Sequence, residues 1–364
     1  MSMTPQGRRV AVIGNGSSGI QIVPGILPKV AHLDHYIRSG TWIAPTFARD
    51  EVNKRGTELG NCFRGASKFL LPGGVDTFKQ DHQVYQRFRK SVERELQSVH
   101  NATRLGTPEQ IEVQDVCAKS MRKRLSQKPE LFDQLLPSFP PFCRRITPGP
   151  GYLEALTVEK VDVITSNTVK VKKDGIVAAD GAHHPTDVPA CATGFDTTFT
   201  PRFPVLGRGG LSLSDRWEKT PETHLSPAVD EFPKYFICFG PNSALGGGNL
   251  LVVVEKLTEY ITACAEKMQR DKIRTMTPRK EAVERFTSYC DQHFSRTTFG
   301  QGCSSLHAMT VLGHPRWEDY TYGYVNDDPN GWFGDGHTLN EKNKAIDVAY
   351  LDDDQIDFPP WLKA

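Results

Sequence analysis

Residues 9–20 have the sequence RVAVIGNGSSGI, in which a short apolar run leads directly into a Gly-x-Gly-x-x-Gly pattern at Gly14, Gly16 and Gly19. This pattern is typical of the turn that joins the first strand and first helix of a dinucleotide-binding βαβ unit. The first glycine permits the tight turn, the second lets the backbone approach a pyrophosphate, and the third lets the helix pack on the strand. The sequence therefore predicts an α/β fold that begins with a nucleotide-binding turn.

The residues after this turn indicate which nucleotide binds. A helix over about residues 17–30 should lead to a second strand at 33–37, which ends near Arg38 and Ser39. Sites for FAD or NAD place an acidic residue here for a ribose 2′-hydroxyl, whereas a guanidinium binds a 2′-phosphate bidentately. We therefore predict a Rossmann-type NADPH site. The alternative is that Arg38 is an ordinary surface arginine and that Asp34 or a later residue contacts the ribose.

Length and composition limit the other possibilities. The chain has 364 residues, which is enough for two domains, with 38% hydrophobic and 24% charged residues. A net charge of +1 gives no reason to expect nucleic acid as a partner. No apolar run approaches the ~18 residues of a membrane-spanning helix, so we expect no membrane span.

The cysteines and histidines are scattered. Eight cysteines occur without a Cys-x-x-Cys motif or a Cys/His cluster at metal-ligand spacing, so we expect reduced thiols, a cytoplasmic protein and no metal site. The pairs His32 with His35 and His183 with His184 are better explained by packing or solvation than by metal binding.

The rest of the chain alternates helical and strand patterns. A helical insertion is predicted at about 76–145, followed by short strands that we expect to form a small antiparallel extension. The predicted helices are 81–99, 108–125 and 129–136, and the predicted extension strands are 161–165, 169–172 and 176–177. Further strands are predicted at 188–192 and 235–239, the latter before a Gly-rich loop at 246–249 and a helix at 250–268.

Taken together, these segments resemble the group B flavin monooxygenases, in particular the Baeyer–Villiger enzymes of fungal secondary metabolism. The resemblance lies in residues 9–24, 36–42, 140–156, 191–208 and 240–261, in the family's order. It implies an FAD domain interrupted by an NADPH domain, and an enzyme that uses NADPH and FAD to insert oxygen into a ketone. The implied substrate is a small molecule, such as a polyketide or terpenoid ketone.

The resemblance also implies roles for individual residues. The residues that would hold NADPH or flavin are Gly14, Gly16, Ser17, Ser18, Gly19, Arg38, Ser39, Thr193, Asn242 and Asn249. Arg145, the second residue of an Arg-Arg pair, matches the arginine that stabilises a developing anion beside the flavin, a role suited to a permanently charged guanidinium. The alternative for Arg145 is a loop arginine paired with a surface carboxylate, and the alternative for the Gly-rich loop is a simple strand-to-helix turn.

The chain departs from the family at its start. Only thirteen residues precede Gly14, where relatives have a first domain that holds the ADP half of FAD. We therefore expect residues 1–194 to form an NADPH-type Rossmann domain and residues 195–364 the C-terminal remnant of a two-dinucleotide-domain flavoprotein. A protein partner that supplies the flavin domain is then expected for tight FAD binding. Two further alternatives are a flavin-independent cyclase, dehydratase or isomerase on the same scaffold, and a non-catalytic partner subunit.

Overall fold

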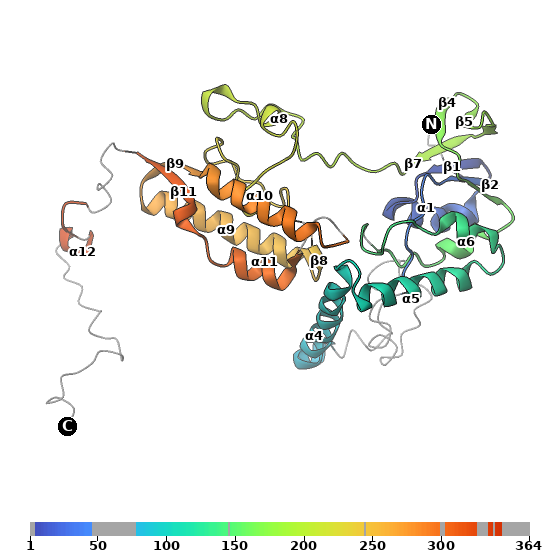
Figure 1. The fold of residues 1–364 in the computed structure, drawn as a ribbon, viewed down its shortest axis with the longest axis horizontal. Coiled ribbons are helices and arrows are strands. Elements are labelled where there is room, and N and C mark those ends of the chain that lie inside the picture. Colours follow the sequence, from blue (N-terminus) through green and yellow to red (C-terminus); the bar gives the residue numbers. More distant parts are fainter. Residues whose placement is uncertain are drawn as a thin grey trace.

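The computed structural model describes residues 4–45, 78–144, 146–243, 245–298, 303–325, 334–337 and 339–343. Figure 1 shows two lobes, an N-terminal lobe of residues 4–192 and a C-terminal lobe of residues 205–325, joined by the segment 193–204. Separate clusters of buried apolar side chains form the cores of the two lobes.

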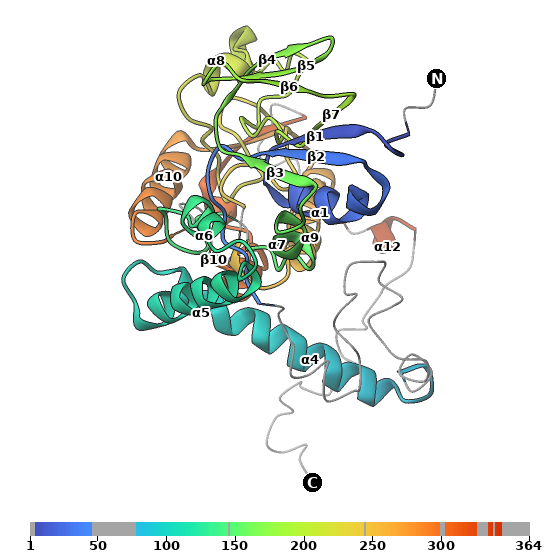
Figure 2. The ribbon, with the colours of Figure 1, turned by 90° about the vertical axis from the view of Figure 1, so that its right-hand side faces the viewer.

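A four-stranded parallel sheet lies at the centre of the N-terminal lobe. Its strands are β1 (Arg9–Ile13), β2 (His32–Tyr36), β3 (Val161–Ile164) and β7 (Val188–Cys191). They lie in the order β3-β2-β1-β7, as Figure 2 shows. This mixed α/β architecture confirms the predicted Rossmann-type fold class.

The assignment of 161–165 to an antiparallel extension was wrong. β3 pairs in parallel with β2, with Val161 opposite Leu33. Both side chains are fully buried in the same core, so the strand buries more apolar surface beside β2 than it could beside the lysine-rich hairpin that follows. The extension itself exists as an antiparallel sheet of β4 (Thr168–Lys172), β5 (Gly175–Ala178) and β6 (His183–Pro185).

Helices pack against the parallel sheet of the N-terminal lobe. The crossover helix α1 (Ser17–Ile26) buries Ile20 and Val23 and continues into η1 (Leu27–Lys29). A buried polar pair joins this core to α7 (Tyr152–Leu156): His35 Nδ1 donates to the Val12 carbonyl at 3.1 Å, and the Tyr152 hydroxyl donates to His35 Nε2 at 2.9 Å. Burial lowers the pKa of His35 to about 4, so the imidazole is neutral at pH 7.

The predicted helical block consists of α4 (His82–Ser98), η4 (Val99–Thr103), α5 (Pro108–Arg124) and α6 (Glu130–Leu135). The Asp81 carboxylate accepts from the first-turn amides of α4, and the Thr107 hydroxyl accepts from the Gln110 amide of α5, so both helices begin at capping residues. α5 and α6 contribute to the N-terminal core through Met121, Leu125 and other apolar residues. By contrast, α4 has no buried residue.

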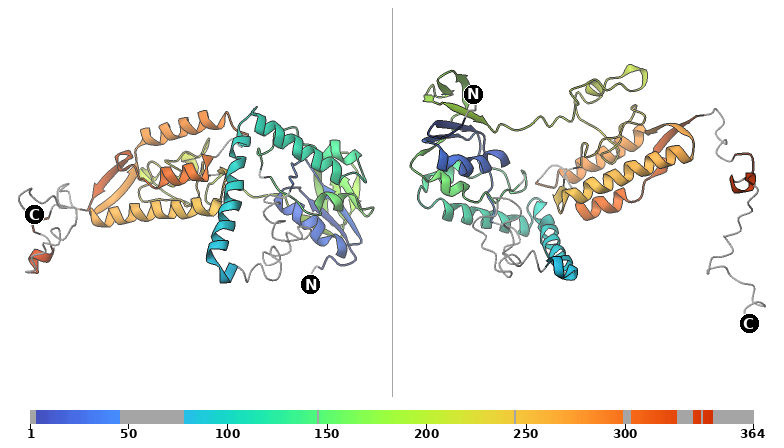
Figure 3. Two further views of the ribbon diagram at one scale, coloured as in Figure 1. Left: turned by 90° about the horizontal axis from the view of Figure 1, so that it is seen from below. Right: turned by 180° about the vertical axis from the view of Figure 1, so that it is seen from behind.

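The C-terminal lobe is built around three helices, α9 (Leu250–Arg270), α10 (Lys280–Phe294) and α11 (Ser305–Leu312), which run side by side in Figures 1 and 3. β9 (Ile273–Pro278) pairs antiparallel with β11 (Tyr320–Tyr324), and β8 (Leu245–Gly247) pairs with β10 (Cys303–Ser304). The shorter elements are η5 (Arg208–Gly210), α8 (Leu213–Arg216), η6 (Trp317–Asp319) and α12 (Leu339–Lys342).

The predicted strand at 235–239 was wrong. The segment forms only one isolated bridge, between Phe236 and Ala228. Lys234 and Phe239, at its two ends, have φ values of 61° and 64°, which lie outside the extended region and break any continuous pairing. The alternation of apolar residues here reflects packing of Phe236 and Phe239 against the C-terminal core rather than a sheet.

The two lobes contact each other where η4 meets the end of α10. The Thr298 amide donates to the Thr103 carbonyl at 2.7 Å, and the Leu105 amide donates to the Arg296 carbonyl at 3.1 Å. Gln97 of α4 also donates to the Ser305 hydroxyl of α11. The helical block therefore belongs to the N-terminal core through α5 and α6 and reaches the C-terminal lobe through α4 and η4.

Among the described helices, none is both long enough and apolar enough to cross a membrane. Seven described cysteines are free thiols. The eighth, Cys62, lies outside the described residues.

Candidate functional site

The ends of three parallel strands meet at one edge of the N-terminal sheet. Ile13, the last residue of β1, is paired with Tyr36 of β2 and with Cys191 of β7. The segments that follow, beginning with Gly14, Ile37 and Ala192, therefore leave the sheet at the same edge. β1 is connected to β2 on one side and lies beside β7 on the other, so the edge is a topological switch point, where open α/β sheets bind their ligands.

Two of the three glycines of the turn are required by close backbone packing. Gly14 has φ of 104°, and a Cβ there would lie 2.4 Å from the Ala192 carbonyl oxygen. A Cβ on Gly19 would lie 1.9 Å from the Gly14 carbonyl oxygen. A Cβ on Gly16 would meet no atom within 4 Å, so this residue faces open space. The first and third glycines thus shape the turn, while the second leaves its outer side accessible.

The N-terminus of α1 has the properties of an anion site. Its N-cap, Gly16, provides no side-chain hydrogen bond, and the first turn contains no acidic residue. Ser17 and Ser18 are exposed there. The first-turn amides therefore point outward without a capping side chain, and the positive end of the helix dipole favours a phosphate.

Two arginines lie at the neighbouring end of β2. Arg38 is exposed, and no described residue forms a hydrogen bond or an ion pair with its guanidinium. Arg144 Nη1 donates to the Ser39 hydroxyl at 3.3 Å, and its guanidinium lies 5.0 Å from the centre of the Phe139 ring. Asn15 Nδ2 donates to the Ser39 carbonyl at 2.9 Å, which ties this segment to the glycine turn. The arrangement places the Arg144 guanidinium on the Ser39 hydroxyl, next in the chain to the exposed Arg38.

Arg144 lies at this edge, although the sequence prediction did not include it. The signal was present in the Arg144-Arg145 pair, but the resemblance directed attention to the second arginine alone. Arg145 itself lies outside the described residues.

Asp34 does not lie at this edge. It is in the middle of β2, its side chain is 2% exposed, and its Oδ1 lies 3.1 Å from His32 Nε2. The same nitrogen lies 3.1 Å from Asp162 Oδ2 on β3. The His32 ring therefore lies between the two carboxylates, within the sheet rather than beside the nucleotide turn, and Asp34 is not placed to contact a ribose.

The remaining predicted site residues are divided between the lobes. Thr193 is exposed and directly follows β7, so it shares the edge with the glycine turn. Asn242 and Asn249 belong to the C-terminal lobe. Asn249 caps α9, because its Oδ1 accepts from the Leu251 amide at 3.0 Å. The structure thus groups eight predicted residues at the sheet edge and places the two asparagines elsewhere.

The Gly-rich loop before α9 packs closely against the chain's own side chains. Gly248 has φ of 94°, and a Cβ there would lie 2.1 Å from the Ser305 hydroxyl and 2.4 Å from Gln97 Nε2. A Cβ on Gly247 would lie 3.2 Å from the Cβ of His100. These contacts account for the two glycines through packing against α4, η4 and α11.

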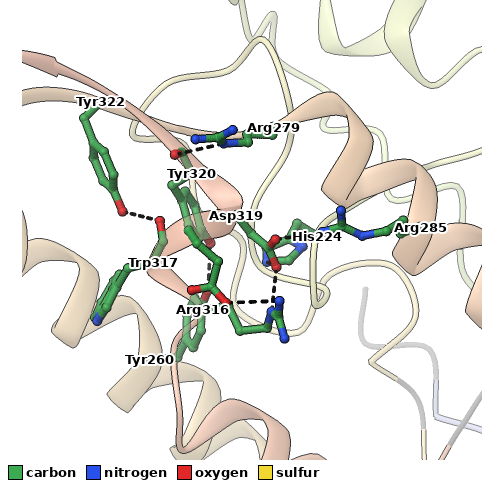
Figure 4. A network of polar contacts seen from close by, with 10 residues as sticks. His224, Tyr260, Arg279, Arg285, Arg316, Trp317, Asp319, Tyr320 and Tyr322 are labelled. Atoms are coloured by element: carbon green, nitrogen blue, oxygen red, sulfur yellow. Dashed lines mark hydrogen bonds and ion pairs between the residues drawn. The ribbon is translucent and has the colours of Figure 1, made fainter.

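A network of polar contacts surrounds the buried carboxylate of Asp319 in the C-terminal lobe (Figure 4). Arg285 Nη2 donates to Asp319 Oδ1 at 2.8 Å, and Arg316 Nε donates to Asp319 Oδ2 at 3.0 Å. His224 Nε2 lies 3.7 Å from Oδ2, and burial lowers the pKa of this imidazole. The network connects η6 to α10 and to the loop that carries His224, so it fixes β11 in place rather than forming an open site.

Comparisons with known proteins agree with this architecture. No family model matches the chain. The FAD-binding monooxygenase tazF of Aspergillus terreus is 30% identical over 95% of this chain and 64% of its own length. The FAD-binding monooxygenase stcW of Emericella nidulans is 32% identical over 98% of this chain and 60% of its own length. The chain therefore spans about three-fifths of the length of the curated relatives it matches.

Solved structures show the same fold. OTEMO in complex with FAD and NADP superimposes with a TM-score of 0.70 at 20% identity, over 88% of this chain and 68% of its own. Cyclohexanone monooxygenase from Rhodococcus sp. Phi1 bound to NADP+ superimposes with a TM-score of 0.68 at 21% identity, over 89% of this chain and 68% of its own. The fold thus matches part of the fold of these two-dinucleotide-domain flavoproteins. In sequence, the chain is similar over nearly its whole length to proteins named FAD-binding monooxygenases.

Proposed function

We propose that the N-terminal lobe binds NADPH at the edge formed by β1, β2 and β7. The observation that carries this proposal is the uncapped, exposed N-terminus of α1 beside two arginines, Arg38 and Arg144. The pyrophosphate would lie over Gly16, Ser17 and Ser18, where amides and the helix dipole favour negative charge.

The 2′-phosphate of the adenosine would lie between Arg38, Ser39 and Arg144. A guanidinium offers parallel N–H donors to phosphate oxygens, and a serine hydroxyl adds another donor. Asn15 holds the Ser39 backbone, so the segment is positioned by the same turn that binds the pyrophosphate. Bound NADPH supplies a hydride, and this lobe's part is to bind and orient it.

We further propose that the protein works with FAD and oxygenates a ketone in a Baeyer–Villiger reaction. The support comes from the sequence relatives: two are named FAD-binding monooxygenases, and a 29% identical relative from Pseudomonas aeruginosa is named a Baeyer–Villiger monooxygenase. An elaborated ketone of fungal secondary metabolism, such as a polyketide or terpenoid, is the substrate class we propose.

Three further residues belong to the proposed flavin and catalytic site. Arg145 would stabilise the anion that develops during oxygen transfer, and Asn242 and Asn249 would lie on the flavin side. The fit of the loop around Asn249 is limited in this structure, since the Asn249 side chain caps α9 and Gly248 is covered by Ser305 and Gln97. We therefore assign no step to this loop. We also propose that 1–194 and 195–364 are the two domains, supported by the separate cores of the lobes.

Binding of adenine nucleotides tests the proposed site. Isothermal titration should give a dissociation constant for 2′,5′-ADP at least about tenfold lower than for 5′-ADP, because only the former carries the 2′-phosphate. Arg38→Gln and Arg144→Gln should each remove most of this preference while leaving 5′-ADP binding unchanged. Arg270→Gln, at the exposed end of α9, is the control and should have no effect.

The proposal fails if 5′-ADP binds as well as 2′,5′-ADP, or if neither arginine variant changes the preference. The oxygenase part is tested separately, by the visible absorbance of bound flavin and by ketone-stimulated oxidation of NADPH. Flavin binding that appears only after a second polypeptide is added would instead favour the partner alternative.

A further inference from the structure

An apolar cavity lies between the three main helices of the C-terminal lobe. Its water-accessible volume is about 80 Å3. The apolar part of its wall comes from the loop after α8 and from α9, α10 and α11, through Leu225, Val253, Leu257, Phe286, Phe294 and Leu312. A concave, mostly apolar site with a few polar groups is the usual form of a small-molecule binding pocket.

A second, cationic pocket adjoins the junction between the lobes. It is lined by Arg104 from the end of η4 and by Gln292, Arg296 and Thr297 from α10 and the residues after it. No described residue forms an ion pair or a hydrogen bond with either guanidinium. The backbone holds the two arginines near each other, because the Leu105 amide donates to the Arg296 carbonyl and the backbone of Arg104 forms an antiparallel β-bridge with Thr297. Two uncompensated positive charges in one pocket favour an anion.

The two pockets share a wall. Tyr289 and His293, one turn apart on α10, line both of them, and their rings stack with centroids 6.0 Å apart and an interplanar angle of 15°. His293 Nε2 is buried and has no hydrogen-bond partner among the described residues. A buried polar atom without a partner carries an energetic cost that a ligand could relieve.

We propose that these two pockets form one binding site for a small molecule with an apolar body and an anionic end, such as an aromatic or aliphatic carboxylate. The apolar body would occupy the cavity between α9, α10 and α11, and the anion would meet Arg104 and Arg296 past the His293 ring. That this ligand is the substrate of the oxygenase rests on the proposed function. That the two pockets bind such a ligand rests on their lining residues alone.

The charges around His293 provide an additional readout. Burial, followed by the positive charges of Arg104, His307 and Arg296, lowers the pKa of His293. His100, on η4, faces the same cluster. Burial is the main cause that lowers the pKa of His100, and the positive charges of Arg104 and His293 lower it further. A bound anion would offset these positive charges and raise the pKa of His293. Binding near pH 6 should therefore be accompanied by proton uptake.

The test uses 2-naphthoate as the probe, with 2-naphthylmethanol as the uncharged analogue and inorganic phosphate as the anion without an apolar body. Titration calorimetry of the whole chain should show 2-naphthoate binding at least about tenfold more tightly than either comparison compound. Arg104→Gln and Arg296→Gln should each weaken 2-naphthoate about tenfold and leave 2-naphthylmethanol unchanged. Arg274→Gln, on an exposed position of β9, is the matched control.

Several results would overturn the inference. They are the absence of 2-naphthoate binding, equal affinity for phosphate, or affinity that neither Arg104→Gln nor Arg296→Gln changes. Titrations at pH 6 in buffers of different ionisation enthalpy should show proton uptake that His293→Gln reduces, and equal heats in all buffers would also count against the inference. None of these experiments uses NADPH, so failure of the nucleotide site and failure of this site give different results.

Discussion

The Cβ position of Gly19 lies 1.9 Å from the carbonyl oxygen of Gly14, a distance that no side chain can occupy. The helix and the strand end are thus in backbone contact, which brings the α1 amides to the edge of the sheet. The two nearest atoms are the carbonyl oxygen and carbonyl carbon of Gly14. The Gly14 amide is hydrogen-bonded to Tyr36 of the sheet, so this backbone cannot move away without a cost in packing.

Replacing Gly19 with alanine should therefore destabilise the lobe. We expect Gly19→Ala to lower the free energy of unfolding by about 1–3 kcal/mol, as overpacking does, and to weaken 2′,5′-ADP binding. Gly25→Ala is the control, because Gly25 is in the same helix and a Cβ there meets no atom within 4 Å. That variant should be as stable as the parent or more stable, owing to the higher helix propensity of alanine. Urea denaturation measures both, and equal stability of the two variants would contradict the packing argument.

Stability should fall as the solution becomes acidic. The pKa of His35 is about 4 in the folded protein and near 6.5 when unfolded, so the unfolded chain binds a proton that the folded chain does not. The contribution of His35 is complete above pH 6.5 and is lost progressively as the pH falls from about 6.5 to about 4, by about 3 kcal/mol in all. Burial lowers the pKa of His100, His224 and His293 as well, which adds loss of the same sign.

Urea midpoints measured from pH 8 to pH 4.5 test this dependence. His35→Gln should flatten the profile because it removes the titrating group while retaining donor and acceptor atoms for Val12 and Tyr152. His314→Gln, which changes an exposed histidine, should reproduce the parent profile. A parent protein whose stability does not change over this range would refute the assignment of His35 as a buried neutral imidazole.

Asp319 and its neighbour Glu318 offer a matched pair of carboxylates. Asp319 is 5% exposed and accepts from Arg285 and Arg316, whereas Glu318 bonds Arg316 at 3.0 Å with both partners more than half exposed. Asp319→Asn should lower the free energy of unfolding by about 1–2 kcal/mol, a value reduced because both arginines can rehydrate. Glu318→Gln should change it by less than about 0.5 kcal/mol. Equal effects in thermal or urea unfolding would show that burial of Asp319 does not matter.

Two adjacent arginines are assigned different tasks. Arg145→Ala should reduce ketone oxygenation by about 100-fold or more, as removal of a group that stabilises transition-state charge does, with NADPH affinity retained. Arg144→Gln should instead weaken NADPH binding. Steady-state kinetics alongside nucleotide titration separate the two, and a loss of NADPH affinity in Arg145→Ala with normal turnover at saturation would reverse the assignment.

The sequence predicted the strand, glycine turn and helix at residues 9–26 well because the signals for them are local. Gly14 and Gly19 each meet a backbone requirement within one turn, and α5 and α9 begin at capping residues that are visible in the sequence. β3 was misassigned because its partner in the sheet is more than a hundred residues away, and local patterning does not report such pairing. The strand at 235–239 failed because positive φ values at Lys234 and Phe239 leave no sign in the apolar pattern.

Arg144 and the cationic pocket were missed for a related reason. Arg104 and Arg296 come together only because η4 meets the end of α10, and no spacing rule connects residues so far apart. The resemblance to a family drew attention to Arg145 and not to its neighbour. Long-range juxtaposition, rather than residue type, decides which arginines share a site.

The pairing of β1 with β7 has a consequence for how the chain acquires its structure. The Arg9 amide bonds to the Asp187 carboxylate across 178 positions of sequence, so the central sheet closes only after the strand near residue 190 has been synthesised. Parallel pairing over such a separation is intrinsically slow, since the entropy of loop closure is lost before the strand contacts form. Until then, the apolar faces of β1 and α1 remain exposed on the ribosome, where chaperones compete with aggregation for them.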